Sequence, residues 1–309
     1  MSAFKTKKLA CYAALPLLCG FASAQAATLP VHCGASGGLN SIGAALKALR
    51  SSEDNGPNTI NVSGACKENV VIQSMDRLTL TAVNGASVSD ASGGTLDVIS
   101  IQDSRDVSIN GFTVNAGSGD SINGISCGDF SICRLSHNVI QGATGGGGFA
   151  VFSQAQATLD GDTLQNNGVG LVMRSGTKIR SETFTSRNNA QGINIGRQAF
   201  AYITAVVENN SDAGIVVQWQ STLELTSGSI SGNGSVGALV RQSSFARFSD
   251  STISGNAGGG VVLSDLSMGN FIGTTVTGNG GGTDVVCNPQ YSATRGVAST
   301  GGTTNCVEP

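Results

Sequence analysis

Three arginines and the single tryptophan recur at intervals of 22 or 23 residues in the second half of the chain. They are Arg174, Arg197, Trp219 and Arg241. A guanidinium group presents a planar fork of donors that fits a carboxylate, and an indole offers a flat apolar ring with one polar edge. This combination predicts binding of an anionic ligand. The alternative is that Arg197 and Trp219 stack on each other and only cover the surface.

The distribution of charge also favours an anionic partner. The chain has 17 lysines and arginines against 20 acidic residues, for a net charge of −3. Residues 174–247 reverse this balance, with seven basic and four acidic side chains. A basic stretch on an otherwise acidic chain indicates an anionic partner. We expect no nucleic-acid partner and, beyond the first residues, no segment that spans a membrane.

The spacing of these residues follows an internal repeat. A glycine opens each unit and an asparagine closes it, and both markers keep a period of 21–23 residues over six units. The glycines are Gly148, Gly170, Gly192, Gly214, Gly237 and Gly260, and the asparagines are Asn167, Asn189, Asn210, Asn233, Asn256 and Asn279. A period of this length indicates a solenoid, a propeller or another repeat array.

Short strands make up each unit. Runs of three to five mostly β-branched or apolar residues follow the glycines, which favours strand over helix. The leucine-rich frame is absent, and a propeller blade needs about 40 residues. We therefore predict an all-β parallel β-helix with three strands and ~22–23 residues per rung. One buried column is expected at Leu171, Ile193, Ile215, Ala238 and Val261.

The glycines and asparagines have expected roles in such a coil. We attribute the 44 glycines to corners that need positive φ. The closing asparagines are expected to stack their amides in a hydrogen-bonded ladder along the axis.

Several rung sequences resemble a known family. Gly-Ile-Asn-Ile-Gly at residues 192–196, the pattern Asn-Asn-x-x-x-Gly and the run Ile-Ser-Gly-Asn resemble the rungs of right-handed parallel β-helix proteins of the pectate-lyase-like superfamily. In these polysaccharide-processing enzymes the strand after the opening glycine carries the substrate groove. The resemblance implies that arginine forks bind uronate carboxylates and that the indole stacks on a sugar ring. The predicted substrate-binding residues are Arg174, Asn194, Arg197, Gln218, Trp219 and Arg241.

No catalytic residue is assigned from the sequence. The polygalacturonases of this superfamily carry several aspartates around the groove, whereas residues 167–170 and 189–192 hold none, so hydrolysis by paired carboxylates is not expected. A lyase or an epimerase needs a base beside a charge neutraliser, for which Arg174, Arg197 or Tyr202 could serve. The alternative function is a non-catalytic surface, adhesion or structural solenoid.

The acidic residues raise the question of a metal. Related pectate lyases bind Ca²⁺ through aspartates on neighbouring rungs, and Asp160, Asp162 and Glu182 could approach such a cluster. A solvated acidic corner is the alternative, and we expect neither a resident metal nor another cofactor.

The first residues predict export. Residues 1–26 have a basic start, an apolar centre and a small-residue cleavage site, as in a secretory signal. A secreted or periplasmic location favours disulfides among the six cysteines that follow. Because a solenoid lets only near neighbours meet, we expect Cys33–Cys66, Cys127–Cys133 and Cys287–Cys306.

Both ends of the coil need covers. Residues 38–49 predict a helix capped by Asn40 or Ser41, with an apolar face at Ile42, Ala45, Leu46 and Leu49. We expect an N-terminal cap with this helix at residues 27–56, the β-helix at 57–286 and a disulfide-stapled C-terminal cap at 287–309.

Overall fold

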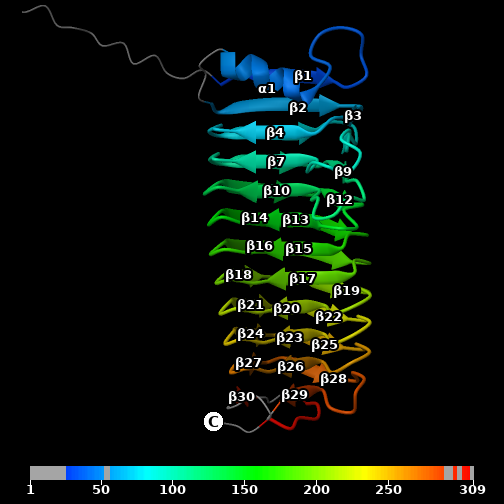
Figure 1. Cartoon of the computed structure of the whole chain (residues 1–309), viewed down its shortest axis with the longest axis vertical. Helices are drawn as coiled ribbons and strands as arrows, with labels where there is room; N and C mark the ends of the chain where they lie inside the picture. Colours follow the sequence, from blue (N-terminus) through cyan, green and yellow to red (C-terminus); the bar gives the residue numbers. More distant parts are fainter. Residues whose placement is uncertain (1–25, 52–55, 289–294, 298–300, 307–309) are drawn as a thin grey trace, which may run out of the picture.

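The chain forms a tall coil of stacked rungs. The computed structural model describes residues 26–51, 56–288, 295–297 and 301–306. Rungs follow one another along the long axis, from a helix at one end to the last strands at the other (Figure 1). Equivalent strands of successive rungs pair in parallel, as Ile193–Ile195 pairs with residues 215–217. The predicted parallel β-helix is confirmed.

One side of the coil is a ten-strand sheet to which each rung gives one strand. Its strands, in spatial order, are β4 (Val70–Gln73), β7 (Ile99–Gln102), β10 (Ile125–Gly128), β13 (Gly147–Val151), β15 (Val169–Met173), β17 (Gln191–Ile195), β20 (Ile215–Val217), β23 (Ala238–Val240), β26 (Val261–Leu263) and β29 (Val285–Cys287).

The rest of the coil is a twenty-strand sheet that contains two columns of strands. The first column is β1 (Thr28–His32), β2 (Asn58–Ser63), β5 (Leu78–Ala82), β8 (Val107–Asn110), β11 (Ile132–Ser136), β14 (Gln156–Gln165), β16 (Lys178–Arg187), β18 (Phe200–Ile203), β21 (Thr222–Thr226), β24 (Phe245–Ser249), β27 (Met268–Ile272) and β30 (Arg295–Val297). The second column is β3 (Ala65–Lys67), β6 (Ser87–Ser89), β9 (Thr113–Asn115), β12 (Val139–Gln141), β19 (Val206–Glu208), β22 (Ser229–Ser231), β25 (Thr252–Ser254) and β28 (Thr275–Thr277).

Three strands per rung is the rule with two exceptions. The ten-residue strands β14 and β16 run through both columns, with register shifts beside Asp160. In these two rungs the second and third predicted strands are continuous.

Successive rungs bury the same position of the ten-strand sheet. Leu171 pairs with Ile193, and Ile193 pairs with Ile215. Ala238 and Val261 continue this column, and all five side chains are fully buried. The predicted buried column is confirmed, and its stacking explains why single rungs need their neighbours.

The opening glycines have a different role from the one predicted. None of the six has positive φ; they are needed because neighbouring rungs approach closely. A Cβ atom at Gly214 would lie 2.6 Å from the carbonyl oxygen of Gly237 and 2.8 Å from Asn233 Nδ2. Such a separation is shorter than van der Waals contact, so space rather than backbone conformation requires glycine there.

The closing asparagines form the predicted ladder. The Oδ1 atom of Asn233 accepts hydrogen bonds from the backbone nitrogen and Nδ2 of Asn210, at 3.1 and 2.9 Å. The same pair of bonds joins each asparagine to the next from Asn167 to Asn279. Asn279 donates to Asp284, whose other carboxylate oxygen accepts two bonds from Thr303. The ladder therefore ends on a carboxylate.

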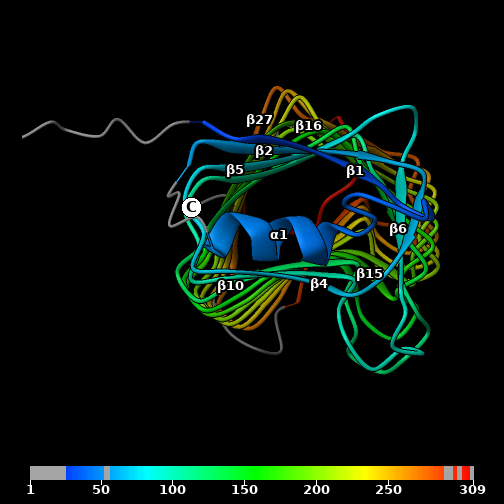
Figure 2. The same cartoon turned by 90° about the horizontal axis from the view of Figure 1, so that it is seen from above.

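The helix α1 (Ile42–Ser51) covers the N-terminal end of the coil (Figure 2). Its predicted apolar residues Ile42, Ala45, Leu46 and Leu49 are all buried. Ser41 caps the helix, because its Oγ accepts a hydrogen bond from Ala44 N at 3.1 Å. The carboxylate of Glu68 also accepts bonds from the first two helical nitrogens, at 2.7 and 3.0 Å. One strand there was not predicted, since β1 pairs with β2 ahead of the helix.

The three predicted disulfides are all present. Cys33 pairs with Cys66, Cys127 with Cys133, and Cys287 with Cys306. The last bond ties residues 301–306 to β29. The predicted signal segment lies outside the described residues, apart from Ala26. Among the described residues, no helix is long and apolar enough to cross a membrane.

Candidate functional site

The outer face of the ten-strand sheet carries the predicted binding residues. Its central column consists of small, apolar or amide side chains that pair rung to rung. These are Ala150, Val172, Asn194, Val216, Leu239 and Val262. They are buried or half-buried although they point away from the core. The face is therefore low and flat along its middle, and longer side chains border it.

A hollow of about 480 Å³ opens on this face over β13 and β15. One border is the glycine segment 145–147, where backbone lies close to the side chain of Val172. The other border is formed by Arg174, Ser175 and Arg197. Because the glycines bring no side chains, the hollow stays open on that border. The hollow thus has a partly apolar floor and a basic rim.

The corner after the ten-strand sheet turns through two left-handed residues in each of several rungs. Arg197 and Gln198 have φ of 57° and 64°, and Trp219 and Gln220 have φ of 55° and 59°. In an equivalent corner Ala155 N donates to Phe152 O at 3.2 Å, which together with the positive φ values fits a type I′ turn. Left-handed backbone costs an L residue about 1 kcal/mol or more. The tight turn projects both side chains of the pair outward.

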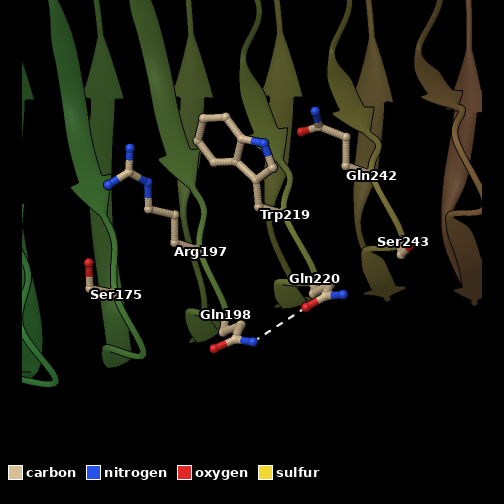
Figure 3. A pocket seen from close by; sticks show the side chains of 7 residues that line it. All are labelled: Ser175, Arg197, Gln198, Trp219, Gln220, Gln242 and Ser243. Carbon is tan, nitrogen blue, oxygen red and sulfur yellow. Dashed lines mark hydrogen bonds between the residues drawn. The ribbon is translucent and has the colours of Figure 1, made fainter.

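Arg197 and Trp219 lie beside each other at this corner (Figure 3). The guanidinium carbon of Arg197 is 5.5 Å from the centre of the indole ring, within cation–π range. Trp219 nevertheless stays 41% exposed. The stacking that the sequence left as an alternative is therefore present, and it leaves part of the ring open to a ligand. A second hollow of about 500 Å³ surrounds this pair.

The second hollow is lined by polar side chains of neighbouring rungs. Gln198 and Gln220 form its edge, with Gln198 Nε2 donating to Gln220 Oε1 at 3.3 Å. Gln242 and Ser243 belong to the next rung and complete it (Figure 3). Ser175 and Arg197 line both hollows, so the two hollows are adjacent.

Three other predicted residues meet in a hydrogen-bonded chain. Arg241 donates from Nε and Nη2 to Gln218 Oε1 at 3.0 and 2.7 Å. Gln218, which is only 4% exposed, donates to Asn194 Oδ1 at 3.3 Å. The guanidinium group of Arg241 is therefore turned toward Gln218 on the preceding rung. The side chain of Gln218 is itself mostly covered. These contacts position the rim of the face.

Arg174 and Arg197 have the charge available for a ligand. Among the described residues the salt bridges are Arg77–Asp76 and Arg134–Asp106, so neither arginine of the rim is paired with an acid. Both side chains are exposed. Together they give the hollow two guanidinium groups that can bind carboxylates in forked geometry.

The acidic residues that suggested Ca²⁺ do not gather at this face. Asp162 is 1% exposed and accepts bonds from the backbone nitrogen and Nδ2 of Asn138, at 2.9 and 2.8 Å. Its burial raises the pKa to about 6, against the opposing effect of the Asn138 bonds and of His137. Asp160 and Glu182 are exposed on the twenty-strand sheet. Among the described residues, Asp160, Asp162 and Glu182 form no cluster of metal-ligand spacing.

The described residues offer one other group of possible metal ligands, at the N-terminal end. It consists of Cys33, Cys66 and Glu68. The two cysteines are joined in a disulfide, and Glu68 caps α1, so this group has other roles. Tyr202, which the sequence nominated beside Arg174 and Arg197, belongs to β18 and therefore to the other sheet. The nomination of Tyr202 for this site was wrong.

Two parts of the site could not be recognised from the sequence. The glycine segment 145–147 carries no side chain that could indicate a site, and only the three-dimensional arrangement makes it a wall of the hollow. The left-handed corner has no glycine signal in most rungs, although Gly176 occupies the second position of one turn. Long polar residues occupy this corner in several rungs, as Arg197, Gln220 and Gln242 do, and they are the sequence signal that marks it.

Comparison with known proteins supports the fold. The family described as "Right handed beta helix region" matches residues 153–296. The coil is a right-handed β-helix. The A-module of the mannuronan C-5 epimerase AlgE4 from Azotobacter vinelandii is similar, with a TM-score of 0.63, 14% identity, and coverage of 84% of this chain and 84% of that chain.

Two further solved structures resemble the chain. The A-module of the mannuronan C-5 epimerase AlgE6 from Azotobacter vinelandii has a TM-score of 0.61 and 16% identity, covering 84% of this chain and 83% of that one. Pectate lyase Pel9A has a TM-score of 0.53 and 13% identity, covering 91% and 78%. At these identities the likeness establishes the fold and not the activity. A sequence comparison with curated proteins found no match.

Proposed function

We propose that the protein binds an acidic polysaccharide along the outer face of the ten-strand sheet. The observation that carries the proposal is the hollow between the glycine segment 145–147 and two arginines, Arg174 and Arg197, which form no salt bridge within the described part of the chain. Carboxylates of the polymer bind these forks, and a sugar ring packs against the free part of Trp219. The predicted contributions of Asn194, Gln218 and Arg241 are indirect in this proposal, because their hydrogen bonds hold the rim.

The proposed chemistry, where the bound chain is processed, is elimination or epimerisation rather than hydrolysis. The structural neighbours include proteins named as mannuronan epimerases and a pectate lyase, which act on uronate polymers. The hollow is lined by arginine, serine, asparagine and apolar groups, and no pair of carboxylates lines it. Inverting or retaining hydrolysis needs such a pair. No catalytic base is assigned.

A second candidate function is a non-catalytic surface or adhesion solenoid. The half-buried apolar residues Val172, Leu239 and Val262 favour it, because they give the face a flat apolar strip that needs no chemistry. The proposal places the protein outside the cytoplasm, either secreted or periplasmic. The three disulfides and the signal-like residues 1–26 support that location.

The binding proposal predicts the effect of removing the two unpaired guanidinium groups. Replacing Arg174 and Arg197 together by glutamine should weaken binding of an acidic glycan at least tenfold, since each charge-assisted bond contributes about 1.5–3 kcal/mol. Binding is measured on a glycan array and then by titration, and an unsaturated-uronate absorbance assay on the hits detects lyase activity. The melting temperature should barely move, because both positions are exposed.

A matched control removes the same charge elsewhere. Lys67 and Arg187 are exposed and lie on the twenty-strand sheet, away from the hollow. Their replacement by glutamine should leave glycan binding unchanged. If the Arg174→Gln, Arg197→Gln protein bound acidic glycans as tightly as the parent, the proposed binding of an acidic polysaccharide would be refuted. The non-catalytic surface or adhesion solenoid would then be the better interpretation.

A further inference from the structure

A second group of cations and aromatic rings lies on the outer face of the twenty-strand sheet. We call it the basic-aromatic face, and it consists of Arg134, Lys178, Arg180, Phe200 and Tyr202. Pairing between rungs sets its layout. Arg134, Thr158, Arg180 and Tyr202 follow one another in one column, and Gln156, Lys178 and Phe200 follow one another in a parallel column two residues earlier in each strand.

The face contains a hollow of about 400 Å³. Thr158 is short and stands between Arg134 and Arg180, one rung above and one rung below it. Rungs are about 4.8 Å apart, so the two arginines start about 10 Å from each other with only a small side chain between them. Ala157 and Ile179 lie at the base of the hollow, with their side chains turned into the core. An anion held over Thr158 is within reach of both guanidinium groups.

Most of the charge around this hollow is not neutralised. Arg134 pairs with Asp106, with Nε 2.6 Å from Oδ1. Lys178 and Arg180 form no salt bridge with any described acidic residue. The Arg180 guanidinium carbon lies 5.5 Å from the centre of the Tyr202 ring. Two free cations therefore sit beside two rings, since Phe200 is 37% and Tyr202 36% exposed.

We propose that the basic-aromatic face is a second, separate binding site for an anionic sugar segment of a polysaccharide. A carboxylate of the segment lies over Thr158 beside Arg180, with Lys178 on the same strand as a second cation, and the apolar side of the sugar ring packs on Phe200 or Tyr202. This site is on a different sheet from the proposed site at Arg174 and Arg197 and does not depend on it. With both sites occupied, one molecule would join two polysaccharide chains.

Two other kinds of partner fit this face less well. A peptide that adds as a strand needs a free strand edge, whereas β14 and β16 are paired on both sides. An anionic membrane would favour apolar side chains that protrude and insert, whereas Phe200 and Tyr202 are nearly two-thirds covered. A flat ligand that carries both an anion and an apolar side matches the cations and the half-covered rings together.

Calorimetric titration with a mannuronate octasaccharide tests the second site. The parent should bind two octasaccharides per chain. The variant Arg134→Gln, Lys178→Gln, Arg180→Gln should bind one, with at least tenfold weaker binding at the lost site. The variant Arg174→Gln, Arg197→Gln should also bind one. A control variant with Lys47, Lys67 and Arg187 changed to glutamine loses three exposed charges outside both faces. This control should still bind two octasaccharides per chain.

The outcomes separate the two sites. Two octasaccharides on the Arg134→Gln, Lys178→Gln, Arg180→Gln variant would overturn the second site. A single octasaccharide on the parent that only this variant loses would support the second site and refute the first. No binding by the parent would overturn both. Phosphatidylglycerol vesicles are sedimented in parallel, and binding of vesicles without binding of octasaccharide would replace the glycan by a lipid surface.

Discussion

Asp162 shows how much a single corner residue can contribute to the behaviour of the coil. Its carboxylate is buried at the bulge of β14, where it accepts bonds from Asn138 and from Asp160 N. Burial raises its pKa from the ordinary 3.8 to about 6, because the charged form loses more hydration than the hydrogen bonds return. The group binds a proton more tightly in the folded protein than in the unfolded chain. Its stabilising contribution is therefore complete below about pH 3.8 and is lost as pH rises through 6.

Replacing Asp162 by asparagine should remove this pH dependence. The difference in free energy of unfolding, parent minus variant, should decrease as the pH is raised from 4 to 7. The decrease should be up to roughly 3 kcal/mol, because each pKa unit corresponds to about 1.4 kcal/mol. Urea unfolding at pH 4, 5.5 and 7 measures the difference. Asp284 titrates in the opposite direction and is common to both proteins: partial burial would raise its pKa, but bonds from Thr303 and Asn279 lower it. A constant difference at the three pH values would contradict the assignment.

Single residues were predicted well where the repeat determines them and poorly where a contact does. The period placed Arg174, Arg197 and Trp219 on successive rungs of one side. It could not show that Gln218 is covered and holds Arg241, because that depends on side chains from two rungs reaching each other. Tyr202 belongs to the second run of its rung, and that run joins the other sheet, so its nomination beside Arg174 and Arg197 did not follow from the repeat.

The asparagine ladder is the element that makes the corners interdependent. Asn210 accepts two bonds from Asn189 and donates from Nδ2 to Asn233 Oδ1 and Ser186 O. All of these groups are buried. Removing one amide in the middle therefore leaves several donors and acceptors without partners and without access to water, at about 1–3 kcal/mol each.

Asn210→Ala should accordingly lower the free energy of unfolding by at least about 3 kcal/mol. Urea unfolding followed by the fluorescence of Trp219 measures the loss. Asn279→Ala is the matched control, because Asn279 is half-buried at the end of the ladder and water can replace some of its bonds. Asn279→Ala should lower the free energy of unfolding by less than half as much as Asn210→Ala does. Equal losses for the two variants would mean that the ladder contributes no more in its middle than at its end.

The fold itself followed from the pattern of glycine, asparagine and strand residues, whereas the reason for the glycines did not. Alternation within each run fixed which side chains of Leu171 and Ile193 face the core. The approach of backbones across neighbouring opening glycines is a property of stacked rungs, and a single rung sequence carries no sign of it. The same limit applies to β1, whose residues pair with β2 only because the chain returns beside it after α1.

At the scale of the whole molecule, stability spreads mainly between adjacent rungs. Each rung pairs with the one before and the one after it. A defect at one end should therefore destabilise only the nearest rungs. The helix α1 is bound mainly to the first rung through Leu46, Leu49 and the carboxylate of Glu68. We propose that residues 27–56 act as a cap of this local kind, and residues 287–309 as a second cap.

Leu46→Asp should detach α1 and loosen only the nearby rungs. Hydrogen exchange should accelerate in α1, β1 and β2, while β20 to β25 keep their protection and Trp219 keeps its emission. Lys47→Asp is the control, because Lys47 is exposed on the same helix and its replacement should leave exchange nearly unchanged. Simultaneous loss of protection along the entire coil would show that the molecule unfolds as one unit and would refute the local cap.

The ladder also has a direction, because the hydrogen bonds between its asparagines all run from the N-terminal to the C-terminal rung. Each asparagine donates to the rung that follows it in the chain, as Asn233 does to Asn256. A stack that stopped at any earlier rung would therefore end on donors without acceptors. Only Asp284, which accepts from Asn279 and is held by Thr303, satisfies the last of them. The carboxylate of Asp284 thus closes the C-terminal end of the ladder with an acceptor that needs no further rung.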